Sequence, residues 1–297
     1  MSRKIMKKVA CNLLALASVV ACAGTFTACE TSHPKVEMEI EFNGETYTLE
    51  YKLFRKIAPS TVSHFLFLAE NGYYDGLCVH DYDMSAEKMY TGAYMATDAS
   101  DDADGLVYKP YYEEIKKFSN YSEFPASVWS NEARTTPTYT VYGEFSSNKF
   151  SVESGALKQT FGSLTMYYHE KDTEDRVYAT YLGGDRKGET VAREYKYNSA
   201  TSQFFISLSE STSSSAKYCT FAQLNGDNSE DELQDLIDDI KDYIEDVYGE
   251  EDAEGFVTGH SVRVDEDDPF VGKKSQTVTF EVPTKPIVIK KVSVKKY

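Results

Sequence analysis

Cysteine and histidine are the residue types of this chain most able to bind metals or act as nucleophiles, and their spacing decides what they can do. The five cysteines divide into three near the N-terminus, Cys11, Cys22 and Cys29, and two further along, Cys78 and Cys219. No Cys-x-x-Cys pair and no His/Cys cluster has the spacing of a zinc site. Cys78 and Cys219 lie in apolar, strand-like runs, so we expect buried free thiols, with a single disulfide as the alternative. We expect no metal and no cofactor.

An acidic segment at 98–105, Asp-Ala-Ser-Asp-Asp-Ala-Asp-Gly, contains enough carboxylates to suggest calcium. A calcium loop of the EF-hand type needs Asp at its first position and Glu at its twelfth. Here the first-position Asp is missing and the twelfth position is Tyr111. We therefore expect a solvated loop without a metal.

The N-terminus has the pattern of a secretory signal peptide, which we predict for residues 1–28. Four basic residues within 1–8 precede a run of apolar and small residues at 9–28. A membrane-spanning helix is the alternative, because about 20 apolar residues can cross a bilayer. The Ala, Gly, Thr and Ser residues in the second half of the run favour the signal peptide.

The end of this run resembles a lipobox, the site at which bacterial lipoproteins are cleaved and acylated. Phe-Thr-Ala-Cys, at 26–29, is followed at once by polar residues, although Phe26 stands where Leu is usual. We expect lipid attachment at Cys29, with Cys22 as a second candidate and simple secretion as a third possibility. The prediction is an extracytoplasmic protein, lipid-anchored to the bacterial cell membrane, with 29–35 as a short tether.

The composition excludes several classes of protein. The chain has 297 residues, of which 41% are hydrophobic, so it can bury a sizeable core. Asp and Glu number 48 against 31 Lys and Arg, giving a net charge of −17. Such a chain is a poor binder of nucleic acid or of an anionic membrane surface, since both need a basic face. The 23 tyrosines suit half-buried strands, where the ring packs inward and the hydroxyl stays in water.

The spacing of apolar residues predicts a mainly β domain over 36–297. Strands are expected at 36–42, 46–53, 161–168, 203–208, 217–224 and 287–294, with helices after Ala58 and over 230–248. Asn43-Gly44 predicts a two-residue hairpin turn between the first two strands. Few helices and no alternation of strand and helix favour a sandwich or a barrel. Insertions are expected near 82–140 and 169–200.

Seven short motifs, in one fixed order, resemble the cyclophilin-type peptidyl-prolyl isomerases. Ala-Pro-Ser-Thr-Val-Ser-His-Phe, at 58–65, resembles the family's Ala-Pro-x-Thr-Val-x-Asn-Phe helix. Gly-Tyr-Tyr-Asp-Gly-Leu-Cys-Val-His, at 72–80, resembles Gly-x-Tyr-Asp-Gly-x-x-Phe-His. The other five motifs lie at 143–145, 162–166, 202–206, 217–221 and 286–289. The resemblance implies a closed eight-stranded antiparallel barrel with two capping helices.

The resemblance also implies catalysis of rotation about Xaa–Pro bonds, which has a barrier of roughly 18–20 kcal/mol. Members of the family hold the peptide with a Gln, an Asn and backbone groups. They enclose the proline ring in an apolar pocket and direct an Arg at the prolyl nitrogen. Catalysis is then electrostatic stabilisation of a twisted peptide bond, with no covalent step.

Five positions are the peptide-binding residues that the resemblance implies: Gln203, Phe205, Tyr167, Tyr218 and Asp81. Gln203 and Phe205 match the family, with Phe205 as a pocket wall. Counting from Gln203 places Tyr218 at the position of the pocket His, and Ser213 at that of the pocket Trp. Tyr167-Tyr168 replace Ala-Asn after Met166, and their bulk would narrow the groove.

Asp81 is the largest departure from the family, because it follows His80 where the family has its catalytic Arg. One such donor supplies about 3–4 kcal/mol of transition-state stabilisation, and an ionised carboxylate cannot donate. The family's Gln is replaced by Thr91 or by Thr97, depending on which of two segments corresponds. No catalytic residue is therefore assigned. His80 is expected to be a structural, hydrogen-bonding histidine.

Two functions are compatible with these residues, and a purely structural envelope lipoprotein is a third interpretation. The first is a weak prolyl isomerase that assists the folding of exported proteins at the cell surface. An Arg of the 169–200 insertion, Arg176, Arg186 or Arg193, could then replace the missing one. The second is a catalytically silent module that binds peptides or a protein partner, which a groove filled by Tyr167 or Tyr168 would favour. Proline-containing segments of exported proteins are the expected partners.

Overall fold

The main sheet begins with the hairpin that the alternation of apolar and charged residues predicts. The computed structural model describes residues 32–97, 105–152, 156–168, 175–194, 199–210, 215–249, 253–265 and 275–297. Strands β1 (Lys35–Phe42) and β2 (Glu45–Leu53) pair antiparallel. Asn43 and Gly44, between them, have φ values of 50° and 93°. Two positive φ values are what a type I′ turn requires, so the tight hairpin follows from these two residues.

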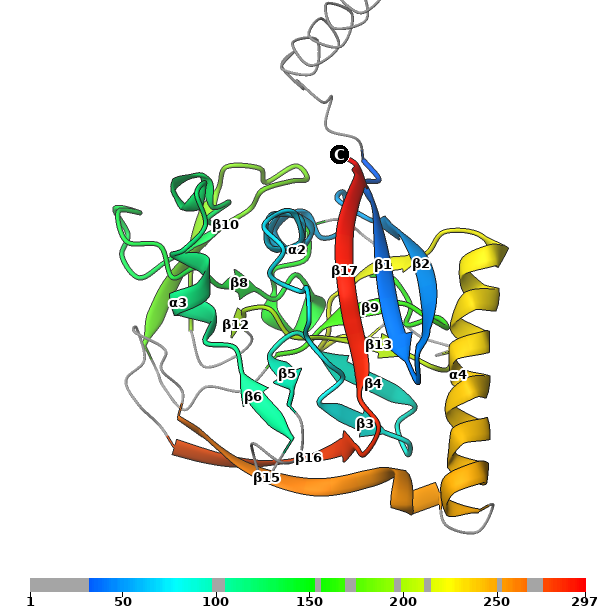
Figure 1. The fold of residues 1–297 in the computed structure, drawn as a ribbon. Helices are drawn as coiled ribbons and strands as arrows, with labels where there is room; N and C mark the ends of the chain where they lie inside the picture. The colour runs from blue at the N-terminus through cyan, green and yellow to red at the C-terminus, as the bar shows by residue number, and fades with distance from the viewer. Residues whose placement is uncertain are drawn as a thin grey trace, which may run out of the picture. The chain divides into compact units, whose positions relative to one another are not determined.

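Eight antiparallel strands form the main sheet, in the order β17–β1–β2–β14–β9–β13–β4–β3 (Figure 1). The other six strands are β3 (Asp81–Asp83), β4 (Lys88–Thr91), β9 (Leu164–Met166), β13 (Phe204–Ser207), β14 (Thr220–Leu224) and β17 (Ile287–Lys296). The sheet curls until its two ends meet. At this junction, just before β3 begins, the Val79 amide donates to the Ile287 carbonyl at 2.9 Å. Cys78 also forms a bridge with Val288. The predicted mainly β, eight-stranded antiparallel fold is confirmed.

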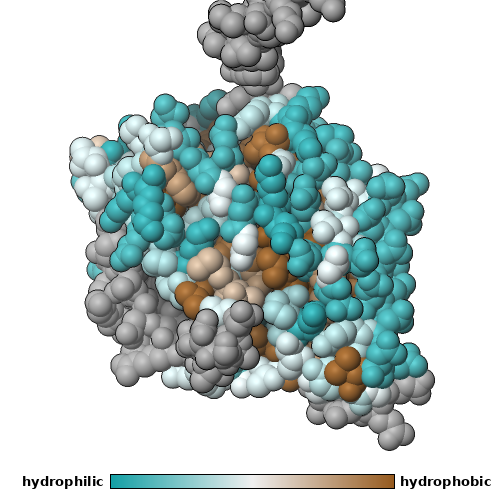
Figure 2. Space-filling model, viewed as in Figure 1, coloured by the Kyte–Doolittle hydropathy of each residue, from teal (hydrophilic) through white to brown (hydrophobic). Residues whose placement is uncertain are grey.

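Two long helices pack against this sheet. Helix α2 (Pro59–Glu70) is buried along most of its length, and proline occupies its first turn. Helix α4 (Asp227–Tyr248) lies beside β2 (Figure 1). Its Leu233, Leu236 and Ile240 are buried. Its outward side is hydrophilic, as Figure 2 shows along the edge that α4 occupies. A short third helix, α3 (Tyr111–Ile115), was not among the predicted elements.

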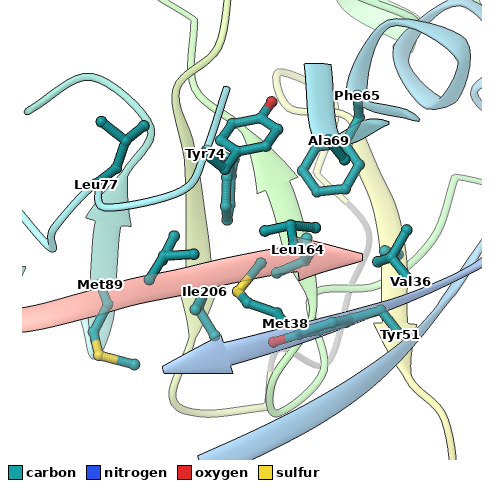
Figure 3. Close-up of a cluster of buried hydrophobic side chains, with 14 of the residues drawn as sticks. Val36, Met38, Tyr51, Phe65, Ala69, Tyr74, Leu77, Met89, Leu164 and Ile206 are labelled. Carbon is teal, nitrogen blue, oxygen red and sulfur yellow. The ribbon is translucent and has the colours of Figure 1, made fainter. Parts of the chain in front are cut away.

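The core lies inside the curled sheet and beneath α2 (Figure 3). Phe65 of α2 packs its ring against Tyr74, Phe204 and Phe221, with centroid distances of 5.0, 5.6 and 5.0 Å. Leu164 and Ile206 enter the same cluster from neighbouring strands, and both are at most 1% exposed. Every second residue of β9 and β13 therefore belongs to the core, which leaves the alternate residues on the outer face.

Smaller sheets surround the main one. Three of them have two strands each: β5 (Tyr94–Ala96) with β6 (Leu106–Tyr108), β8 (Val141–Tyr142) with β12 (Ser199–Ala200), and β15 (Val257–Asp265) with β16 (Ser275–Pro283). A fourth has three strands, with β10 (Arg176–Thr180) between β7 (Val128–Trp129) and β11 (Thr190–Glu194). Short 3₁₀ helices are η2 (Tyr121–Glu123), η3 (Ser146–Asn148) and η4 (Ala253–Phe256). The β15–β16 hairpin was not predicted, because apolar residues do not recur at every second position of 257–265.

Several predictions concern residues outside the described ranges. These are the signal peptide, Cys22 and Cys29, most of the acidic segment at 98–105, and Ser213. The other two cysteines, Cys78 and Cys219, are buried free thiols, as expected. Among the described residues, none of the helices combines the length and the apolar character needed to span a membrane.

Candidate peptide-binding site

One row of residues crosses five strands on the outer face of the main sheet. We call it the outer row: Asp81 on β3, Tyr90 on β4, Phe205 on β13, Thr165 on β9 and Thr220 on β14. Directly opposed residues of antiparallel strands have their side chains on the same face. Since Phe204 and Ile206, the neighbours of Phe205 along β13, point into the core, the outer row points away from it.

Phe205 is the apolar centre of the outer row, and it is completely buried. The rings of Tyr90 and Tyr218 lie 5.2 and 5.9 Å from its ring, and the Lys88 Nζ lies 4.8 Å from the ring centroid. Tyr167 packs edge-on against Tyr90 at 5.5 Å. The structure thus brings together Phe205, Tyr167 and Tyr218, three of the predicted site residues. Tyr90, Tyr218 and Lys88 thus contact the phenylalanine, and Tyr167, which is half-buried like the other two tyrosines, extends this cover through Tyr90.

Asp81 lies at one end of the outer row and is engaged by another part of the chain. Its Oδ1 accepts a hydrogen bond from the backbone amide of Glu281, on β16, at 2.9 Å. Burial raises the pKa of Asp81, although the hydrogen bond from Glu281 lowers it. The position at which the resemblance places the catalytic Arg therefore holds a hydrogen-bond acceptor, which attaches the β15–β16 hairpin to β3.

Gln203 and His80 form a hydrogen-bonded pair beside the outer row. The Gln203 carbonyl also accepts from the Tyr167 amide at 3.0 Å. Burial lowers the pKa of His80 to about 3, against the raising effect of Gln203. At neutral pH the imidazole is therefore uncharged, and it packs between Tyr94 and Phe280. This agrees with the expectation of a structural histidine, and the pair fixes how Gln203 lies.

Gly92 allows the end of β4 to approach the start of β13. Its φ is +100°, and an added Cβ would come within 2.4 Å of the Ser202 carbonyl oxygen. The preceding residue, Thr91, is buried and donates its hydroxyl to the Cys78 carbonyl at 2.8 Å. The segment 89–93 is therefore the one beside β13, whereas 94–96 pairs with β6. Thr91 is paired with Phe204 and so faces the core, away from the outer face.

The three arginines of the 169–200 segment do not provide the cation above Phe205, which is Lys88. Arg186 forms an ion pair with Glu189 and stacks over Tyr181, with its Cζ 4.2 Å from the ring. Arg176 and Arg193 line a separate cavity that also borders Tyr218. Of the described residues, the structure thus places a lysine of β4, and no arginine of this segment, over the Phe205 ring.

Sequence reasoning missed Lys88 and Tyr90 as members of the site. Both alternate with the buried Met89 along β4, which indicates one exposed face. What the sequence could not provide is the pairing of β4 with β13, which places Tyr90 opposite Phe205. Within the ranges that the structure describes, no group of three or more His, Cys, Asp or Glu residues is placed to hold a metal ion.

The curled eight-stranded sheet and this site define the class of protein. Residues 36–253 match the family model described as cyclophilin type peptidyl-prolyl cis-trans isomerase/CLD. The chain belongs to this family. No curated protein sequence matches the chain.

Solved structures of cyclophilins are similar to this chain at low sequence identity. A cyclophilin type peptidyl-prolyl cis-trans isomerase of Cryptosporidium parvum is 14% identical, with 89% of this chain and 99% of that chain covered and a TM-score of 0.41. A structure of the same isomerase in the presence of the dipeptide Ala-Pro is 15% identical, with 89% of this chain and 99% of that chain covered and a TM-score of 0.39. The Mimivirus cyclophilin is 13% identical, with 90% of this chain and 91% of that chain covered and a TM-score of 0.42.

Proposed function

We propose that this protein binds proline-containing peptide segments of exported proteins on the outer row, with weak or no prolyl isomerase activity. The observation that carries the proposal is Phe205, which is fully buried against Tyr90 and Tyr218, with Tyr167 packed on Tyr90. Tyrosine offers a large amphipathic contact surface at low entropic cost. Their rings suit a proline ring, and their hydroxyls suit the flanking peptide carbonyls.

The same site lacks the usual means of catalysis. Catalysis requires interactions that are stronger in the twisted transition state than in the bound peptide. Asp81 accepts a hydrogen bond from Glu281 and has no proton to direct at a prolyl nitrogen while it is ionised. Binding without acceleration is the expected consequence.

The test is a peptide titration by NMR, with the full chain in mild detergent and the peptide acetyl-Ala-Ala-Pro-Ala-amide. Tyr218→Ala should weaken binding about tenfold, because central tyrosines of binding sites often contribute this much. Tyr108→Ala is the matched control, since Tyr108 is 50% exposed and lies outside the outer row. Equal affinity of wild type and Tyr218→Ala would contradict peptide binding at the aromatic side chains around Phe205.

A second candidate, a weak isomerase, is favoured by Lys88. Its ammonium group lies over the Phe205 ring and carries the positive charge that the Asp81 position lacks. If Lys88 polarises the prolyl amide, Lys88→Gln abolishes acceleration, whereas Lys88→Arg retains it. Exchange NMR on the same peptide decides between the two, because a binding module shows no acceleration in any variant.

We propose further that the protein is lipid-anchored at the outer side of the bacterial cell membrane through Cys29. The support is the sequence of 26–29 and the polar residues that follow it. Cys29→Ala should move the protein from the membrane fraction to the soluble fraction, and Cys22→Ala should not. The reverse result would assign the lipid to Cys22, and membrane retention of both variants would contradict a lipid anchor.

A further inference from the structure

A cavity of about 660 Å³ opens beside Tyr218. Among the described residues, its lining has an unusual charge balance, with four basic side chains and one carboxylate. The basic residues are Lys149, Arg176, Arg193 and Lys217, the carboxylate is Glu194, and the aromatic residues are Tyr142, Tyr168 and Tyr218. This is the reverse of the whole chain, which has 48 acidic and 31 basic residues. A local excess of positive charge on an acidic protein indicates an anionic ligand.

The basic wall is held by hydrogen bonds rather than by flexible side chains alone. The Arg193 guanidinium donates to the Lys149 carbonyl at 3.1 Å and to the Ala192 carbonyl at 2.9 Å, so it joins β11 to the end of η3. Ser147 of η3 donates its amide and its hydroxyl to the Ala216 carbonyl, at 3.0 and 2.6 Å. These contacts connect the segments that carry Lys149, Arg193 and Lys217, so the charges converge on one space.

Tyr218 connects this cavity to the outer row. Its ring lies 5.9 Å from that of Phe205, and the same side chain lines the cavity. A peptide whose proline contacts the outer row would therefore bring a neighbouring residue to the cavity. Tyr167 and Tyr168 also place the two regions next to each other, since Tyr167 packs on Tyr90 and its chain neighbour Tyr168 lines the cavity.

We propose that this cavity binds acidic side chains that flank the proline, so that the protein selects acidic proline-containing peptides. This inference rests on the proposed function. Arginine guanidinium groups form strong, directional hydrogen bonds with carboxylates, and Arg176 and Arg193 both line the cavity. A short acidic segment fits better than a long polyanion, which the net charge of −17 would repel.

The test is calorimetric titration of the full chain in mild detergent with three capped peptides. They are acetyl-Glu-Glu-Ala-Pro-Ala-amide, its Gln-Gln counterpart, and the Glu-Glu peptide with alanine in place of proline. The double variant Arg176→Gln, Lys217→Gln removes two cavity charges. The control, Lys187→Gln, Lys241→Gln, removes two exposed charges outside the cavity lining, so the net charge of the two variants is the same.

We expect the Glu-Glu peptide to bind wild type and the control about tenfold more tightly than the Gln-Gln peptide, since hydrogen bonds to charged groups are strong. The double variant and 0.5 M salt should each abolish most of this preference. Equal binding of the two proline peptides overturns the inference and leaves the proposed function intact. Equal binding of the Glu-Glu peptides with and without proline supports the anionic site but contradicts proline binding. If no peptide binds, both fail.

Discussion

Phe204 and Phe205 are neighbours on β13 and both are completely buried, but different parts of the molecule bury them. Phe204 points into the curled sheet, where Phe65 and Tyr74 lie 5.6 and 5.5 Å from its ring. Phe205 points outward and is covered by half-buried tyrosines and Lys88. The inner face is closed by other core residues, whereas the outer face is closed by side chains that also reach solvent. A buried residue can therefore belong to a binding site, provided that its cover can move.

The largest expected effect that tests this comparison is on stability. Phe204→Ala should lower the free energy of unfolding by about 3–5 kcal/mol, because it leaves a cavity among rigid core residues. Phe205→Ala should cost only about 1–3 kcal/mol, since the tyrosines can close over the space. Urea denaturation of both variants measures the difference. Equal losses would mean that Phe205 is an ordinary core residue.

Glu144 is an ionisable group that is buried in the interior, so its protonation tests how well the inner side of the molecule excludes water. Its carboxylate accepts hydrogen bonds from the amides of Ser60 and Thr61, at 3.0 and 2.9 Å, at the start of α2. Burial raises the pKa of Glu144 to about 7, against the lowering effect of these hydrogen bonds. The folded protein thus keeps a proton that the unfolded chain releases at lower pH.

The stability contributed by this proton is fully present below about pH 4.5 and is lost as the pH rises through about 7, with a total of up to about 3 kcal/mol. Burial lowers the pKa of His64 to about 4 and of His80 to about 3. These two histidines therefore lower the free energy of unfolding as the pH falls below 6.5, because the unfolded chain binds the protons first. The observable is therefore the stability of wild type minus that of Glu144→Gln, measured by urea denaturation between pH 5 and 8. A difference that does not fall with rising pH would contradict the raised pKa.

Asp81 tests how the outer face is attached to the β15–β16 hairpin. Asp81→Ala removes the acceptor of the Glu281 amide and should cost about 1 kcal/mol. Hydrogen exchange at that amide should become faster. Asp81→Asn keeps an acceptor oxygen and should preserve the protection. Unchanged exchange in Asp81→Ala would show that the hairpin is held without this contact.

The smallest effect is expected at the ion pairs on the outer surface. Lys290 and Glu41 are 2.7 Å apart, with side chains that are 49% and 38% exposed. Because exposed pairs are screened by water, Lys290→Gln should change the free energy of unfolding by less than about 0.5 kcal/mol. Thermal denaturation measures the shift, and a loss of 2 kcal/mol or more would show that surface charges contribute as much as the core.

Local patterns in the sequence predict the inner face well. The hairpin at 36–53, helix α2 and helix α4 all follow from the spacing of apolar residues and from turn and capping residues within a few positions. The resemblance to the family supplied the eight-stranded antiparallel barrel and the expected roles of Gln203 and Phe205. These features can be predicted from neighbouring residues and from the family fold, without knowing which residues far apart in the sequence contact each other.

The outer face could not be predicted in the same way, because it is assembled from distant parts of the chain. Asp81 and Glu281 are 200 residues apart in sequence, and no local pattern indicates their hydrogen bond. Tyr90 and Lys88 come to lie over Phe205 only through the pairing of β4 with β13. The basic cavity likewise joins segments near 149, 193 and 217.

In the function that we propose, this chain binds peptides on the outer row but has lost most of the catalysis that its family is named for. Exchange NMR on acetyl-Ala-Ala-Pro-Ala-amide, with the full chain and with Phe205→Ala, tests it most directly. We expect the proline resonances to shift with wild type and not with Phe205→Ala, while the cis–trans exchange time stays at tens to hundreds of seconds, as in the free peptide. Exchange within a second in the presence of wild type, or no shift of the proline resonances, would contradict the account.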